Sequence, residues 1–224
     1  MLVRDEKKRL DRKLERIRND PSGFKEFIIA DAKDADMAFG IAAPGPASRK
    51  PGNGYEKADG PWKTLEDYRN QIRAVIKQNI VDIVLLSASN LEQLAIKESL
   101  FENSAVTPAA RANDTSDIWK VRGGNYCEHP SRPFRTATID HIKYGRLEKD
   151  HLKTVTGAEL GLYSITFNND LAHDLRSLEE FHAFRLEAEK KHFRYFLEVF
   201  NPNIDSGFRS QQVGSFLNDH IVRC

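Results

Sequence analysis

Three carboxylates and one ammonium group crowd into a six-residue segment, DAKDAD (31–36), at the end of the first apolar run of the sequence. An aspartate that ends a strand and points into a pocket can act as a general base, because apolar walls raise its pKa and a nearby cation holds it ionised. We therefore predict that Asp31 and Lys33 are catalytic and that Asp34 and Asp36 bind substrate. Turn formation and helix capping are the alternative roles for acidic residues in this position.

A further carboxylate, Glu198, lies inside the apolar run YFLEVF (195–200). Burial there demands a charged or hydrogen-bonding partner, which a cation on an adjacent strand of a barrel would supply. We predict that Glu198 is catalytic, with a structural ion pair as the alternative. Polar residues also stand at the ends of other apolar runs, and we predict that four of them bind substrate: Ser87, Arg111, Asn168 and Asn201.

Other constellations give weaker signals. The seven histidines have no HxH or HExxH spacing, so no zinc site is predicted. Cys127 has no neighbouring signature of an activated thiolate, and the glycine pair 123–124 belongs to no GxGxxG or GxxxxGK motif. Arg132 and Arg135 lie in a basic segment that could contact a phosphorylated ligand or nucleic acid, and a solvated loop is the alternative.

Five short apolar runs must position these residues. Their continuous apolar character is typical of strands that are buried on both faces of a parallel sheet. The runs are 27–30, 80–86, 105–107, 160–167 and 195–200. Helix-forming sequence follows most of them, and this alternation predicts an α/β fold of parallel βα repeats of the TIM-barrel type with right-handed crossovers.

Three of the intervening helices have readable starts. Thr64 precedes a helical repeat of apolar residues and has Asp67 three positions later, which predicts a capped helix start. Ser89 opens an S-N-L-E capping-box pattern for a helix that ends near Phe101. The segment 170–193 predicts a long amphipathic helix. The apolar face of that helix comprises Leu171, Leu175, Leu178 and Phe181.

Two domains and two insertions follow from these elements. We assign 1–22 to a charged N-terminal helix that packs over one end of the fold, and 23–224 to a partial (β/α) barrel domain. Segments without helical or strand periodicity interrupt the barrel at 41–62, which is rich in Pro and Gly, and at 108–156. Because the first follows a strand, we expect it to line the carboxyl edge of the sheet, where α/β folds bind ligands.

Composition excludes several classes of protein. The 224 residues include 34 Lys+Arg and 33 Asp+Glu, a formal net charge of +1 that gives no sign of a polyanionic partner such as nucleic acid. No run approaches the roughly 18 apolar residues that a membrane span requires, and the charged N-terminus has no signal-peptide core. Two cysteines, Cys127 and Cys224, without CxxC spacing favour a cytoplasmic location.

The layout resembles the class I aldolase type of (β/α)8 barrel, the group that includes deoxyribose-phosphate, tagatose-bisphosphate and archaeal-type fructose-bisphosphate aldolases. The resemblance lies in FIIADAKDAD (27–36), IVDIVLLSAS (80–89) and FLEVFNPN (196–203). It implies a carbon–carbon lyase that acts on a small carbonyl or sugar-phosphate compound. In such enzymes a lysine near the sixth strand forms a Schiff base, and loops of the last two strands hold phosphate. The resemblance assigns Asp31 to the strand-one acid and Glu198 to the group near the lysine.

The sequence departs from that family in its strand count. Only five strands are predicted, and the family's lysine and phosphate loops would lie beyond Cys224. We therefore expect an amino-terminal portion of an incomplete barrel that is inactive by itself. No lysine lies in a convincing apolar strand, and the acidic neighbours of Lys33 oppose a nucleophilic role.

Two other functions remain open. Metal-assisted enolate chemistry in the same kind of barrel would use Asp31, Asp34, Asp36 and Glu198 as oxygen ligands of Mg²⁺. The aldolase-type function, by contrast, is expected to need no cofactor. The second is a non-catalytic module that binds a phosphorylated ligand or nucleic acid through the basic segment. Because an unclosed barrel leaves strand edges unpaired, a homo-oligomer is a further expectation.

Overall fold

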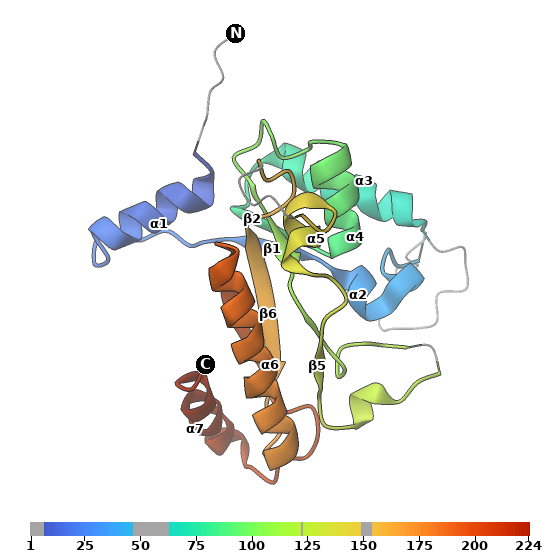
Figure 1. Ribbon diagram of the computed structural model, residues 1–224, viewed down its shortest axis with the longest axis vertical. Coiled ribbons are helices and arrows are strands. Elements are labelled where there is room, and N and C mark those ends of the chain that lie inside the picture. The colour runs from blue at the N-terminus through green and yellow to red at the C-terminus, as the bar shows by residue number, and fades with distance from the viewer. Residues whose placement is uncertain (1–6, 47–62, 122, 149–153) are drawn as a thin grey trace, which may run out of the picture.

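The fold is a sheet of five parallel strands that curls into a half-barrel, with helices along its outer face (Figure 1). The computed structural model describes residues 7–46, 63–121, 123–148 and 154–224. The strand order is β1-β2-β3-β6-β7. The bounds are Ala30–Lys33 for β1, Ile83–Leu86 for β2, Thr107–Arg111 for β3, Leu160–Thr166 for β6 and Arg194–Phe200 for β7.

Helices follow the strands along the chain, as the alternating pattern predicts. β1 is followed by α2, a 3₁₀ turn (η1) and α3; β2 by α4, which continues as a π-helix (η2); and β6 and β7 by α6 and α7. The bounds are Ala35–Phe39 (α2), Gly40–Ala42 (η1), Leu65–Gln78 (α3), Ala88–Leu91 (α4), Glu92–Lys97 (η2), Leu171–Lys190 (α6) and Ser210–Ile221 (α7). The prediction of an α/β fold with parallel βα repeats is confirmed.

The larger hydrophobic core lies between the sheet and these helices. Tyr163 of β6 contacts Phe181 and Phe184 of α6, with ring centroids 4.9 and 4.7 Å apart, and α6 runs along β6 (Figure 1). Val84 and Leu86 of β2 belong to the same fully buried cluster. Each such side chain stabilises the fold by about 1.5–3 kcal/mol through burial.

A smaller core fills the amino end of the concave face. Strand side chains alternate between the two faces, so Ile83 and Leu85 point opposite to Val84 and pack with Leu160 and Leu162. Leu10 of the N-terminal helix α1 (Arg9–Asn19) joins this cluster and is 4% exposed. The charged helix therefore covers one end of the half-barrel. Of the segment 1–22 that was assigned to it, residues 1–6 lie outside the described part of the chain, and the helix occupies Arg9–Asn19.

Asp82, the residue before β2, attaches α1 to the sheet. Its carboxylate is fully buried and accepts hydrogen bonds from the Ile29 amide (2.7 Å) and from Lys13 Nζ of α1 (2.8 Å). Arg9 adds a hydrogen bond from Nη1 to the Val81 carbonyl at 2.7 Å. Because a buried carboxylate is stable only when it is paired, this contact fixes where the helix sits.

The predicted bounds of three strands differ from the observed ones. The second, predicted at 80–86, is shorter and begins at Ile83, and the other two are displaced along the chain. The first was expected at 27–30, but β1 begins at Ala30, and Phe27 is 83% exposed. β1 is an edge strand that pairs only with β2, so its register follows the pairing of Ala30 with Ile83 and not its own apolar run. The third was expected at 105–107, but β3 extends to Arg111, because the small Ala109 and Ala110 are fully buried there.

The second insertion contains regular structure, contrary to the prediction for 108–156. It holds the end of β3, a short antiparallel pair of β4 (Asp114–Thr115) and β5 (Pro133–Phe134), and a 3₁₀ turn, η3 (Tyr126–Glu128). The helix α5 (Ile139–Tyr144) then leads to β6 and begins at a Thr138 cap. Elements this short carry too few residues for a periodic signal. Of the first insertion, 41–62, residues 47–62 lie outside the described part of the chain.

Helix starts were predicted with mixed success. The Thr64 cap is confirmed, since Thr64 Oγ1 accepts a hydrogen bond from the Asp67 amide at 3.1 Å. In return, the Asp67 carboxylate accepts a hydrogen bond from the Thr64 amide. The next helix is capped by Ser87 and not by Ser89, and its π-helical end is Lys97 and not Phe101. The cap moves because β2 ends at Leu86, which places the Ser87 hydroxyl against the Asn90 amide.

The predicted apolar face of α6 is only half correct. Phe181 is buried, but Leu171 and Leu175 are 76% and 50% exposed. Asp174 is buried in the first turns instead, because its carboxylate accepts a hydrogen bond from the Asn168 amide at 2.8 Å.

Among the described residues, no helix combines the length and the apolar character that crossing a membrane requires.

We predict that Asp82→Ala lowers the free energy of unfolding by about 3 kcal/mol, because Lys13 and the Ile29 amide lose their buried partner. Urea denaturation measures the change. The control is Glu15→Ala, which removes an ion pair with Lys7 between two half-exposed side chains of the same N-terminal region and should have little effect. Equal losses in the two variants would show that Asp82 does not anchor α1.

Candidate functional site

A layer of polar side chains follows the apolar ones on the concave face of the sheet. On this face the apolar residues of β2 and β6 lie at the amino end, and all five strands have a polar residue two positions before the carboxyl end, at that end or directly after it. Ser164 and Glu198 are register partners in β6 and β7. Asp34 and Ser87 directly follow β1 and β2, and Arg111 ends β3. The carboxyl edge of the half-barrel is therefore its polar end, the edge where α/β folds bind ligands.

Arg111 lies at the centre of this layer and is 6% exposed. Its Nη1 lies 3.0 Å from Asp34 Oδ2 and 3.9 Å from Glu198 Oε2, and its Nε donates to the Asn113 carbonyl at 3.2 Å. The guanidinium thus joins β3 to the ends of both edge strands. Its Nη2 is buried and has no hydrogen-bond partner among the described residues. A buried guanidinium N–H without a partner is costly, so a hydrogen-bond acceptor placed beside Nη2 would stabilise this site.

Asn113 holds the end of β3 against β6. Its Oδ1 accepts from the Ser164 amide at 2.7 Å, and its Nδ2 donates to the Ser164 carbonyl at 2.8 Å. Main-chain pairing of these strands ends at Arg111 with Leu162, so the Asn113 side chain makes the two bonds that another strand residue would make. Sequence reasoning missed Asn113, since a lone asparagine after a strand has no distinguishing pattern.

The second half of the site is built on Asp36 of α2 and Ser87. The Ser87 hydroxyl donates to Asp36 Oδ2 at 2.5 Å. The other carboxylate oxygen, Oδ1, is buried and makes no hydrogen bond of good geometry in the described part of the chain, although the Asn90 side chain lies near enough to lower the pKa of this carboxyl group. Burial raises the pKa of Asp36 above its ordinary value, although the bond from Ser87 opposes that change. A carboxyl group with this environment suits proton transfer nearer neutral pH.

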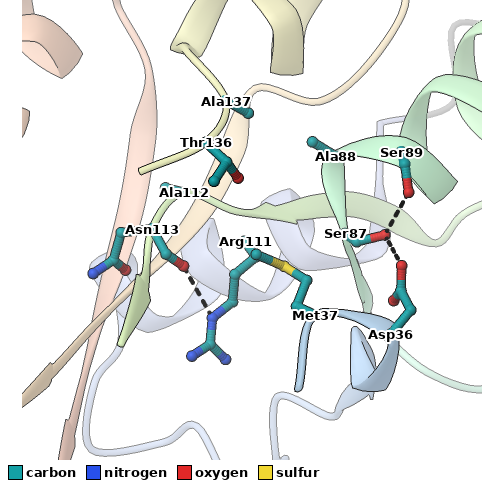
Figure 2. Close-up of a pocket in the computed structure, with 10 residues that line it drawn as sticks. All are labelled: Asp36, Met37, Ser87, Ala88, Ser89, Arg111, Ala112, Asn113, Thr136 and Ala137. Carbon is teal, nitrogen blue, oxygen red and sulfur yellow. Dashed lines mark hydrogen bonds between the residues drawn. The ribbon is translucent and has the colours of Figure 1, made fainter. Parts of the chain in front are cut away.

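These two halves line one cavity of about 360 Å³. Figure 2 shows Arg111 and Asn113 on one side and the Ser87 hydroxyl between Asp36 and Ser89 on the other. The lining residues are Asp36, Met37, Ser87, Ala88, Ser89, Arg111, Ala112, Asn113, Thr136 and Ala137. The volume is that of a small-molecule site.

Two more aspartates stand behind Arg111 in the β3–β6 insertion. Asp117 accepts hydroxyl hydrogen bonds from Ser131 (2.8 Å) and Thr166 (2.9 Å). Asp114 is 5% exposed, and burial raises its pKa to about 6 even though the Thr115 amide and the Arg111 charge act in the opposite direction. Neither residue was identified from the sequence, because the segment had no predicted structure.

Five of the predicted site residues come together here: Asp34, Asp36, Ser87, Arg111 and Glu198. The cation near Glu198 is Arg111, which comes from β3 and not, as predicted, from an adjacent strand. The adjacent strand β6 contributes the Ser164 hydroxyl, which donates to Glu198 at 2.9 Å. Glu198 is the most open of the charged groups, with 39% of its side chain exposed.

Asp31 and Lys33 are placed elsewhere, which corrects the expectation that Asp31 ends a strand and faces the pocket. Both lie inside β1, where Asp31 is the register partner of Val84 and Lys33 that of Leu86. Val84 and Leu86 belong to the core under the helices, so this face is opposite to that of Arg111. Lys33 Nζ pairs with Asp31 Oδ1 at 2.8 Å.

The two predicted asparagines also lie apart from Arg111. Asn168 is buried, and its Oδ1 accepts from the Asn203 amide at 3.0 Å, which ties the loop after β6 to the loop after β7. Asn201 is exposed and lines a separate cavity of about 370 Å³ beside α7. Neither residue lines the cavity at Arg111.

The residues proposed as Mg²⁺ ligands do not fit a metal ion. Asp31 faces away, and Asp34 and Glu198 already have the Arg111 guanidinium between them. Within residues 7–46, 63–121, 123–148 and 154–224, no three His, Cys, Asp or Glu side chains form a metal-binding group.

Arg132 and Arg135 of the basic segment, which could have contacted a phosphorylated ligand, instead contact other parts of the protein. Arg135 Nη1 pairs with Glu187 of α6 at 2.6 Å, and its Nε donates to the Ala112 carbonyl at 3.2 Å. The guanidinium lies over the Phe184 ring, 5.3 Å from its centroid. Arg132 is exposed and donates to His173 at 3.3 Å. Arg135 therefore holds the insertion on α6.

We predict that Asp114→Asn stabilises the protein at pH 7.5 and not at pH 4. The folded state holds the Asp114 proton up to about pH 6, whereas the unfolded chain releases it near pH 3.8. Ionisation of Asp114 therefore lowers stability as the pH rises through this window, and the amide removes that loss. The gain above pH 6 should be about 1–3 kcal/mol, measured by urea denaturation at both pH values. An equal gain at pH 4 would contradict the argument.

No protein-family model matches this sequence, and no curated protein matches it either.

Proposed function

We propose that the polar layer binds a small hydroxy-carbonyl compound and transfers a proton beside its carbonyl group, as in aldolase-type carbon–carbon lyase chemistry. One observation supports this function above all. Arg111 Nη2 is a buried donor and Asp36 Oδ1 a buried acceptor, neither makes a hydrogen bond of good geometry in the described part of the chain, and both residues line the same cavity of about 360 Å³. A ligand with one acceptor and one donor oxygen would satisfy both.

The residues suit the steps of an aldol reaction. In the bond-forming direction, the Asp36 carboxylate takes a proton from the carbon next to the carbonyl. The C–H electron pair becomes the C=C bond of the enolate, and the π pair of the carbonyl moves onto its oxygen. Arg111 Nη2 donates to that oxygen and stabilises the enolate as its charge develops. The enolate carbon then attacks the carbonyl carbon of an aldehyde, and the aldehyde oxygen takes up the electron pair of its π bond together with the proton held by Asp36. Cleavage is the reverse of these steps. Burial raises the pKa of Asp36, which makes its carboxylate a stronger base.

Schiff-base formation needs an amine that this cavity does not supply. Among the described residues that line it, none is a lysine, and Lys33 is paired with Asp31 on the opposite face of β1. The proposal therefore covers binding and proton transfer, and uses the Arg111 guanidinium to hold the enolate oxygen.

The test is exchange of the carbon-bound protons of dihydroxyacetone, or of dihydroxyacetone phosphate, for deuterium in D₂O, followed by proton NMR. We expect the protein to exchange these protons for deuterium. In Asp36→Asn the exchange should be slower by about 100-fold or more, since the amide cannot accept the proton. The rate should rise with pH as Asp36 loses its proton, with a midpoint above the ordinary aspartate value of about 3.9.

Asp219→Asn is the matched control, because it makes the same change on the exposed surface of α7 and should leave the exchange rate unchanged. Circular dichroism checks that both variants are folded. The proposed function is excluded if the protein exchanges neither compound, or if Asp36→Asn exchanges as fast as Asp219→Asn.

A further inference from the structure

The charges around the cavity are unequal. In the described part of the chain, the guanidinium of Arg111 is the one cationic group that lines the cavity, and Asp36 is the carboxylate that lines it. Behind them stand Asp34, 3.0 Å from Arg111 Nη1, and Glu198, 3.9 Å from the same atom. Asp34 and Glu198 thus compensate the charge of Arg111, and with Asp36 in the cavity wall the site has no excess positive charge for a group that enters as an anion.

Arg111 nevertheless keeps a hydrogen-bonding function. Asp34 and Glu198 both approach Nη1, and the Asn113 carbonyl takes Nε, which leaves Nη2 for the ligand. Ser87, Ser89 and Thr136 add neutral hydroxyl groups to the cavity wall. The cavity therefore offers hydrogen-bond donors and acceptors, but no excess positive charge for a ligand group that enters already ionised.

We infer that the cavity takes the uncharged, hydroxylated part of its substrate and discriminates against phosphate and carboxylate groups. The inference rests on the proposed function and names the class of compound that this site accepts. A phosphate dianion would lie close to Asp34, Asp36 and Glu198, where like charges repel in a partly dehydrated site. A hydroxyl group can accept from Arg111 Nη2 and donate to Asp36, and it brings no charge.

A cationic ligand is the other possibility that three carboxylates suggest, and Arg111 argues against it. An ammonium group has three donors and no acceptor, so it would leave Arg111 Nη2 without a partner and would add repulsion between two cations. A neutral hydroxy-carbonyl group satisfies the donor on Arg111 and the acceptor on Asp36 together.

Dihydroxyacetone and dihydroxyacetone phosphate test this inference as a matched pair, since they differ only in the phosphate. We expect the protein to exchange the neutral compound with a kcat/KM at least about tenfold higher. The preference should shrink as NaCl is added from 20 to 500 mM, because salt screens repulsion of the anion and leaves the neutral compound unaffected.

The variant Glu198→Gln tests whether the charge of Glu198 is what disfavours the phosphate compound. The amide oxygen can still accept from Ser164, as the carboxylate does, but one negative charge near Arg111 is removed. We expect the ratio of phosphate to neutral exchange to rise about fivefold in this variant. The control is Glu179→Gln, the same change on the exposed surface of α6 with 70% of the side chain exposed, which should leave the ratio unchanged.

Saturation-transfer NMR of both compounds measures binding independently of exchange. Preferential binding and exchange of dihydroxyacetone phosphate, with the same ratio in Glu198→Gln, would overturn the inference and leave the proposed function in place. Binding of dihydroxyacetone alone, without exchange of either compound, would exclude the proposed function and support the discrimination. Binding of neither compound would exclude both.

Discussion

The ion pairs of the buried Arg111 are the interaction on which the carboxyl edge of the sheet depends. A guanidinium that is 6% exposed must find compensating charge, and it does so with Asp34 after the first strand and Glu198 in the last. Asp34 directly follows the edge strand β1 and Glu198 lies in the edge strand β7, so a single side chain from the central strand β3 connects both sides of the half-barrel. Its position in turn relies on Asn113, which extends the pairing of β3 with β6 beyond the main chain.

The amino edge of the same sheet uses a different solution. There the concave face is apolar, and α1 covers it with Leu10 while its Lys13 pairs with the buried Asp82. The two ends of the half-barrel are therefore chemically distinct, with apolar packing under a helix at one end and a polar cavity at the other. This difference follows from the order of side chains along the strands, and the packed sheet positions the hydrogen-bonding groups of the cavity.

Much of the architecture could be read from the sequence. The strands β6 and β7 are long apolar runs and were found nearly at their observed bounds, and the alternation of strands with helices gave the parallel topology. The strands β1 and β3 were misplaced, because an edge strand takes its register from its neighbour and because alanines give little apolar signal. The inserted elements, including Asn113 and Asp114, were not foreseen, since a segment of two to six residues has no measurable period.

For the site, the sequence by itself determined which residue types stand near the carboxyl ends of the strands: Asp34, Asp36, Ser87, Arg111 and Glu198. Only the tertiary structure decided which of them share a face and which are paired. Side chains alternate along a strand, so a shift of one residue moves a group to the other face, and this separates Asp31 and Lys33 from Arg111. Hydrogen-bond partners such as Ser164 and Asn113 are 51 residues apart in the chain, and only the folded sheet brings them together.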